Sequence, residues 1–146
     1  MRFAAKAVIL SLTLTAGVAI AKEGVEDPTV KARMDVMGII GANTKVLGDM
    51  AGDKAPYDAT AAEAAKLALA AAAAQIPTVF EVEADDPVAE ARPDIWMNME
   101  GFVEKANALE TTAGAMDVSS LATLQAGMGA LAETCKSCHT DFRAKK

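Results

Sequence analysis

The only two cysteines and the only histidine of this 146-residue chain stand together near its end, in the run Cys135-Lys136-Ser137-Cys138-His139. On a helix, residues three or four apart share one face, so both thiols and the imidazole would point the same way. Two thiols at this spacing can each add to one vinyl group of a haem, and the imidazole can then reach the iron. The run therefore predicts one covalently attached haem c, held by Cys135 and Cys138, with His139 as the proximal iron ligand.

Three other kinds of site use cysteine and histidine, and each fits this run less well. A thioredoxin-like dithiol needs a strand–turn–helix context, and no strand pattern is visible. A zinc site needs about four ligands, whereas the run supplies three. A disulfide within one helical turn has poor geometry and leaves His139 without a role. Because the chain has one histidine, a second imidazole cannot bind the iron within one subunit, and a sixth ligand must come from upstream.

The rest of the chain is predicted to form helices, because alanine is abundant and apolar residues recur every three or four positions. Asp27 before Pro28 is typical of a helix start, and the run 52–56 breaks this first helix. Further helices are expected over about 58–75 and 98–116, and a last one begins at 117–120 and carries the haem motif. Four amphipathic helices with mostly short connections predict an all-α protein, an antiparallel four-helix bundle with haem bound near the C-terminal helix.

Two helices carry the clearest stripes of apolar and small residues. The first helix repeats them at Val30, Met34, Met37, Gly41, Thr44 and Gly48, and the last at Leu121, Leu124, Met128, Leu131, Cys135, Cys138 and Phe142. The segment 77–93 is irregular and rich in Asp, Glu and Pro. Its acidic run, Asp85, Asp86 and Glu90, is expected to be a solvated loop.

Residues 1–21 have the pattern of a cleaved signal peptide. Arg2 and Lys6 precede a short apolar stretch, and Ala19-Ile20-Ala21 is the small-x-small pattern of a cleavage site. A membrane anchor is the alternative, but the apolar stretch is short for a span. Residues 22–146 would then form one haem domain, with no membrane insertion after cleavage. Cleavage would change the net charge from −6 to −8, which argues against nucleic-acid binding and favours weak, charge-guided contacts with partners.

Four features in order make the chain resemble the class II c-type cytochromes, the cytochrome c′ group. They are the Arg33–Met37 pair, the run Ala55-Pro56-Tyr57-Asp58, the run Arg92-Pro93-Asp94-Ile95-Trp96, and the haem motif followed by Asp141-Phe142-Arg143. The resemblance implies a periplasmic bundle with haem between the helices, commonly a homodimer. It also implies that Arg33 and Arg143 lie close to the haem propionates. The alternative for both arginines is a solvated surface charge.

The resemblance places Met37 over the open face of the haem, where it is either the sixth iron ligand or a bulky residue that does not bind the iron. Met34, one turn earlier, is the nearest competitor. With Met37 bound, the expected function is electron transfer between redox partner proteins. With the iron open, the alternative is binding or buffering of nitric oxide or carbon monoxide. An enzyme such as a peroxidase is not expected, because no distal histidine is present to act as acid and base.

Overall fold

The computed structural model describes residues 24–145, so the predicted signal peptide lies outside the described residues and its cleavage stays a prediction. Six helices form in this range: α1 (Pro28–Ala51), α2 (Ala59–Ala73), α3 (Ile76–Val79), α4 (Asp94–Met97), α5 (Met99–Ala115) and α6 (Leu121–Phe142). None of the helices in the described part is both long and apolar enough to span a bilayer.

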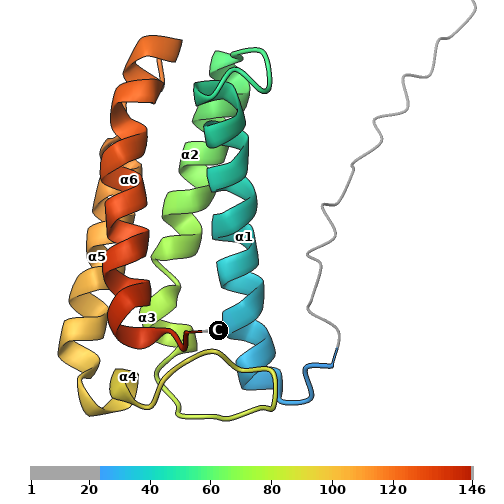
Figure 1. The fold of residues 1–146 in the computed structure, drawn as a ribbon, viewed down its shortest axis with the longest axis vertical. Coiled ribbons are helices and arrows are strands. Elements are labelled where there is room, and N and C mark those ends of the chain that lie inside the picture. Colours follow the sequence, from blue (N-terminus) through green and yellow to red (C-terminus); the bar gives the residue numbers. More distant parts are fainter. Residues whose placement is uncertain (1–23, 146) are drawn as a thin grey trace, which may run out of the picture.

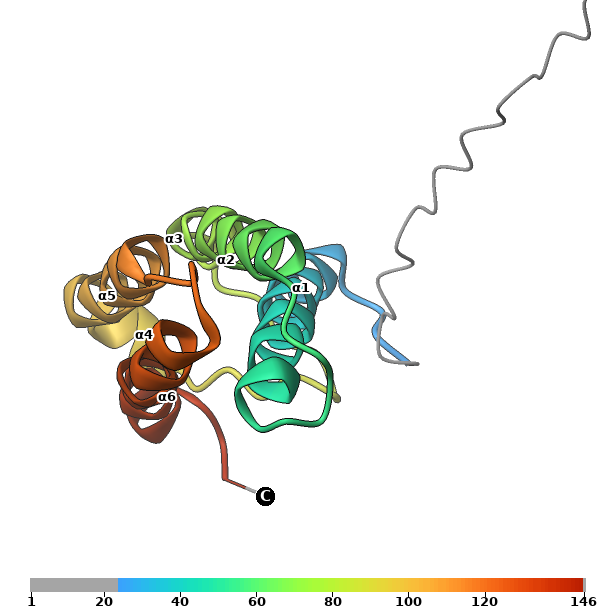
Figure 2. The ribbon, with the colours of Figure 1, turned by 90° about the horizontal axis from the view of Figure 1, so that it is seen from above.

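The four long helices run alternately up and down and close into a ring, as Figures 1 and 2 show. Around this ring α1 packs on α2, α2 on α5, α5 on α6, and α6 returns to α1. The expected antiparallel four-helix bundle is confirmed. The two short helices were not expected: α3 and α4 lie at either end of the loop 80–93, within or beside the segment predicted to be irregular.

Each long helix begins where a polar side chain accepts a hydrogen bond from a free backbone N–H of the first turn. Asp27 caps α1, with its Oδ1 2.7 Å from the N–H nitrogen of Thr29. Asp58 caps α2 and Asn98 caps α5 in the same way. Ser120 and Thr123 form a reciprocal capping box at the start of α6. The predicted helix starts agree with these caps.

The core is filled by α2 alanines and by large residues of the other helices. Ala62, Ala65, Ala72 and Ala73 are all buried, which lets α2 pack closely against α1 and α5. Toward the end of the bundle that holds the C-terminus of α6, Phe102 packs against Phe80 and Phe142, at ring-centre distances of 5.0 and 5.3 Å. These aromatic contacts tie α5 to the start of the loop and to the end of α6.

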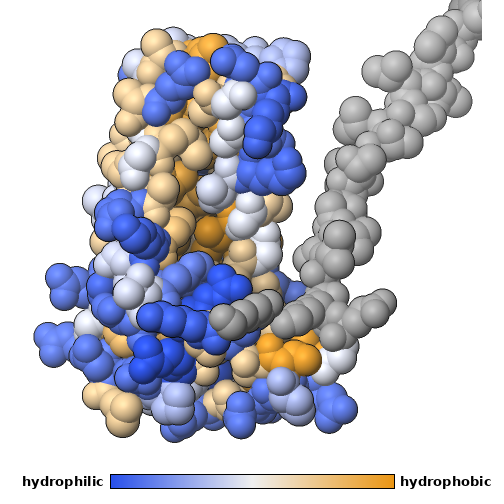
Figure 3. All heavy atoms as spheres, viewed as in Figure 1, coloured by the Kyte–Doolittle hydropathy of each residue, from blue (hydrophilic) through white to orange (hydrophobic). Residues whose placement is uncertain are grey.

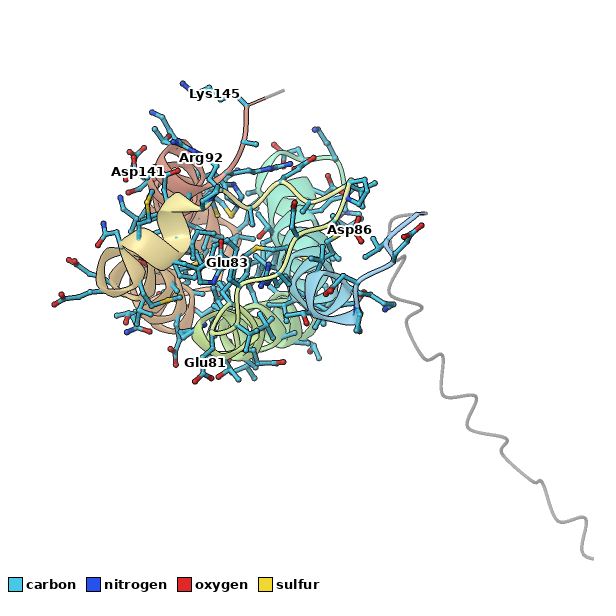
Figure 4. All side chains as sticks on the ribbon, turned by 90° about the horizontal axis from the view of Figure 1, so that it is seen from below. Glu81, Glu83, Asp86, Arg92, Asp141 and Lys145 are labelled. Carbon is cyan, nitrogen blue, oxygen red and sulfur yellow. The ribbon has the colours of Figure 1, made fainter. Side chains whose placement is uncertain are left out.

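The acidic loop 80–93 is a structural part of the bundle at Asp86, where the expectation of a solvated loop is wrong, whereas Asp85 is exposed as expected. It passes beneath the lower end of α1 and returns to α4, as Figures 1 and 4 show. Asp86 is only 6% exposed, and its Oδ2 accepts hydrogen bonds from the backbone N–H groups of Glu26 and Asp27 at 2.8 and 2.9 Å. Three such N–H groups, the third from Val88, hold the pKa of Asp86 below its usual value. The Asp86 carboxylate accepts these hydrogen bonds and is largely shielded from water.

Candidate functional site

A largely apolar cavity of about 510 Å³ lies between α1 and α6, closed below by the loop 80–93 and the start of α5. Figure 3 shows the corresponding strip of apolar surface, running between polar residues on the face between these two helices. The volume falls in the range of small-molecule and cofactor sites, roughly 300 to 1,000 Å³. The cavity is therefore the candidate for the predicted haem site.

The structure brings Cys135, Cys138 and His139 together on the α6 wall of this cavity. The capping box fixes the start of α6, and Cys135 and Cys138 lie on the same inward face as the buried residues Leu124, Leu131 and Phe142, so the motif is turned to the cavity. Burial raises the pKa of both thiols. Partial burial and the charge of Arg143 lower the pKa of His139, against the opposing effect of Glu90. The lowered pKa favours the neutral imidazole, which is the form that binds metal ions.

The opposite wall is built by the predicted stripe of α1. Met34 and Met37 both line the cavity, each partly buried. At Gly38 and Gly41 an added Cβ would meet no heavy atom within 4 Å, so both glycines leave open space on the cavity side of the helix. The α1 residues that enter the core form a second stripe: Val36, Ile40, Leu47 and Met50. The stripe read from the sequence is thus mainly the wall of a binding site.

These features fit a covalently bound haem. Two thiols and one imidazole stand on one wall, two thioethers on the other, and a glycine-lined apolar space lies between them. The hydroxyl oxygen of Thr44, also in the wall, is buried without a hydrogen-bond partner in the described part of the chain. Within residues 24–145 no group of three or more His, Cys, Asp or Glu side chains is placed to hold a bare metal ion.

Arg33 is buried, only 3% exposed, so the alternative of a solvated surface charge is wrong for this residue. Its Nε and Nη1 donate to the carbonyl oxygens of Val79 and Ala84 at 3.1 and 3.0 Å, and Nη2 donates to that of Val82. Arg33 also lines the cavity. Sequence reasoning had no way to find these partners, because any residue type offers a backbone carbonyl. A contact between Arg33 and a haem propionate stays a prediction.

Arg143 lies at the cavity rim, about half exposed, and forms an ion pair with Glu90. Its Nε donates to Glu90 Oε2 at 2.7 Å. The chain around Arg143 pairs with the loop as an isolated antiparallel bridge to Ala91. The ion pair and the bridge together hold the end of α6 beside the cavity. The role of Glu90 was not predicted, and a contact between Arg143 and a propionate stays a prediction.

Lys105 of α5 supports the motif from behind. Its Nζ lies 2.6 Å from the hydroxyl oxygen of Ser137 and 3.0 Å from Oδ2 of Asp141. These contacts fasten the last turns of α6 to α5, and so fix the helix that carries His139. The residue gave no signal in the sequence, since a lysine on an amphipathic helix is ordinarily a surface charge.

Comparison with known proteins agrees with the geometry. Residues 28–143 match the family model described as Cytochrome C'. Cytochrome c-556 of Agrobacterium tumefaciens is 36% identical over 122 residues, which cover 81% of this chain and 96% of the relative. A solved cytochrome c' from Rhodobacter Spheriodes has a TM-score of 0.74 at 30% identity, covering 81% of this chain and 96% of that one. A nitric oxide complex of a variant cytochrome c prime from Alcaligenes xylosoxidans has a TM-score of 0.70 at 26% identity. The match covers 80% of this chain and 94% of that one.

Proposed function

Because this chain belongs to the cytochrome c′ family and carries one covalently attached haem c, we propose that it is a periplasmic electron-transfer protein and not an enzyme. The observation that carries the proposal is Met37. It lines the α1 wall of the same cavity whose α6 wall carries His139, so a thioether and an imidazole are available from two sides.

We assign one role to each of the cysteines and the histidine of the motif, and one to Met37. Cys135 and Cys138 attach the haem, His139 is the proximal iron ligand, and Met37 is the distal ligand. The haem supplies a centre that takes up and releases one electron. A thioether ligand raises the reduction potential of a haem iron. A fixed pair of protein ligands also keeps the surroundings of the iron the same in both oxidation states, which favours fast transfer.

The two arginines are proposed to hold the haem propionates. A guanidinium has five N–H donors, and Arg33 uses three of them on backbone carbonyls. Two donors therefore remain for a carboxylate at the cavity wall. Arg143 lies at the rim with Glu90, where a half-exposed guanidinium can bind a second carboxylate.

The second candidate function is binding of nitric oxide or carbon monoxide at an open iron. Its support is the solved relative whose title names a nitric oxide complex. The two functions differ in whether Met37 binds the iron. Redox partner proteins, and a homodimer in place of a monomer, remain proposals. Large exposed apolar side chains on α1 and α2, namely Ile39, Val46 and Leu67, support a surface for a second copy.

Replacing Met37 with alanine tests the distal ligand. The wild type should be low-spin and slow to bind carbon monoxide, and Met37→Ala should become high-spin and bind it readily. Met34→Ala is the matched control, because Met34 lines the same wall one turn earlier and should leave both properties unchanged. Optical spectra and carbon monoxide mixing experiments measure both. A wild type that is already high-spin and open would make Met37 a steric lid and favour the gas-binding function.

A further inference from the structure

Arg33 is an unusual buried cation because its hydrogen-bond partners are backbone carbonyls and not carboxylates. Among the described residues only Arg33 and Asp86 are charged and buried. Burial of a charge costs free energy unless its hydrogen bonds are satisfied, and a buried ion can often be replaced by an apolar residue without loss of stability. Stability alone therefore does not explain why an arginine is buried at position 33.

The guanidinium of Arg33 grips the first part of the loop 80–93 and the residue before it. Its three nitrogens each donate to a different carbonyl, those of Val79, Val82 and Ala84. The Cζ atom also lies 5.0 Å from the ring centre of Phe80 and 4.9 Å from that of Trp96. Trp96 Nε1 in turn donates to the carbonyl oxygen of Phe80 at 2.9 Å. A single side chain of α1 thereby fixes the backbone of the whole turn beneath it.

Asp86 makes the reverse connection, from the loop to α1. Its Oδ2 accepts from the N–H groups of Glu26 and Asp27, the two residues that lead into the helix, while its Oδ1 accepts from Val88. Figure 4 shows Asp86 on the loop beside the lower end of α1. A cation of the helix binds loop carbonyls, and an anion of the loop binds the N–H groups at the helix start. We call Arg33 and Asp86 together the loop clamp.

The loop clamp acts on the part of α1 that carries the methionines. Arg33 precedes Met37 by four residues, about one turn or 6 Å along the helix, so the two side chains share a face. Both also line the cavity. A shift or tilt of this end of α1 would therefore move Met37 relative to His139, whose own helix is held by Lys105.

We propose that Arg33 is a positioning residue: with Asp86 it holds the start of α1 at the height and tilt that bring the Met37 thioether to the iron. The inference rests on the proposed function, in which Met37 is the distal ligand. It assigns to Arg33 a role that a propionate contact would not require, because the three carbonyl bonds serve the loop and the helix.

The test uses the haem-loaded protein with Arg33→Lys, Asp86→Asn and both changes together. Lysine keeps the charge, but its single ammonium cannot reproduce the planar three-carbonyl grip. We expect carbon monoxide to bind at least about tenfold faster to Arg33→Lys, equivalent to roughly 1.4 kcal/mol. The absorption band of the methionine–iron bond should weaken in parallel. Asp86→Asn should act in the same direction, and the double variant should show less than the combined effect, because one clamp is being removed twice.

Gln125→Ala is the matched control at the other end of α1. It removes one side-chain bond to the carbonyl of Ala51, of 2.9 Å, far along the helix from Met37. It should lower the melting temperature without changing the band or the binding rate. Hydrogen exchange at the N–H groups of Glu26 and Asp27 gives a readout independent of haem, and should speed up in Asp86→Asn.

Two results would overturn the inference, and they are distinguishable. If Arg33→Lys and Asp86→Asn lower the melting temperature as Gln125→Ala does but leave the band and the rate unchanged, the clamp is structural only and the proposed function stands. If the wild type itself is high-spin and binds carbon monoxide as fast as Met37→Ala, the distal ligand is wrong and the positioning role falls with it.

Discussion

The two sides of α1 use small residues for opposite purposes. Toward α2, short side chains of the partner helix bring the two helices together, and the buried α2 alanines Ala62, Ala65, Ala72 and Ala73 are at most 4% exposed. Toward α6, the small residues Gly38 and Gly41 have nothing within 4 Å of a built Cβ, and Met37 is only partly buried. A small residue allows close helix packing when a neighbouring helix fills the space beside it. Where no helix fills that space, the small residue leaves a cavity. The closed side is completed by the chain itself, whereas the open side leaves the apolar cavity that we propose holds the haem.

Removing the haem should produce the largest effect on this contrast. In Cys135→Ala/Cys138→Ala, acid–acetone should extract the haem, whereas the wild-type haem should stay on the chain. The resulting empty apolar cavity should cost about 4 kcal/mol or more, as large core deletions do, lowering the melting temperature by roughly 15 °C. Circular dichroism measures the melting.

Two outcomes would contradict this prediction. Haem that stays on the double variant would show that the two cysteines are not the attachment points. A haem-free chain that melts with the wild type would show that the open side needs no filling, and the contrast between the two sides of α1 would fail.

Overfilling the closed side should have the next largest effect. Ala62 is fully buried in α2, so Ala62→Leu forces extra volume into a packed interface and should destabilise the protein by about 1–3 kcal/mol. Ala64→Leu on the exposed face of the same helix is the control and should change stability by about 0.5 kcal/mol at most. Urea unfolding with the haem in place measures both. Equal effects would mean that this side is no more tightly packed than the surface.

The smallest effect should come from closing one of the gaps on the open side. Gly41→Ala improves helix propensity by about 1 kcal/mol and should stabilise the haem-free chain by that amount. The haem-loaded protein should gain less or lose stability, since the new methyl enters the space that the cofactor fills. Gly129→Ala on α6, also without neighbours but outside the cavity lining, should gain about 1 kcal/mol in both forms. A gain at Gly41 that is the same with and without haem would contradict the open-side interpretation.

Local signals in the sequence predicted the helices and the motif. Asp27, Asp58 and Ser120 mark helix starts through bonds to residues two to three positions away, and such bonds follow from residue type and spacing alone. Cys135 and His139 share a helical face for the same reason. The structure then added a second face to α1, because the stripe through Met37 lines the cavity and a different stripe enters the core.

The contacts that sequence reasoning missed join residues far apart in the chain. Arg33 binds carbonyls 46 to 51 positions away, and Glu90 pairs with Arg143 across 53 positions. Asp86 accepts hydrogen bonds from N–H groups 60 and 59 positions earlier in the chain. The sequence shows only its acidic neighbours, which are typical of a solvated loop. Backbone carbonyls and N–H groups belong to every residue type, and no composition or periodicity indicates which of them a distant charge will meet.

The bond between Asp86 and the start of α1 also sets an order on folding. The partners of its carboxylate, the N–H groups of Glu26 and Asp27, lie 60 and 59 positions earlier in the chain. At a synthesis rate of about 5–20 residues per second, these groups wait roughly 3–12 s before their acceptor exists. The helix that bears Met37 can form its own turns early, but its first residues are anchored only after α2 and the turn beneath it have been made. The end of the bundle beside the proposed haem site is thus completed by contacts of long sequence separation, to which those of Asp86 belong.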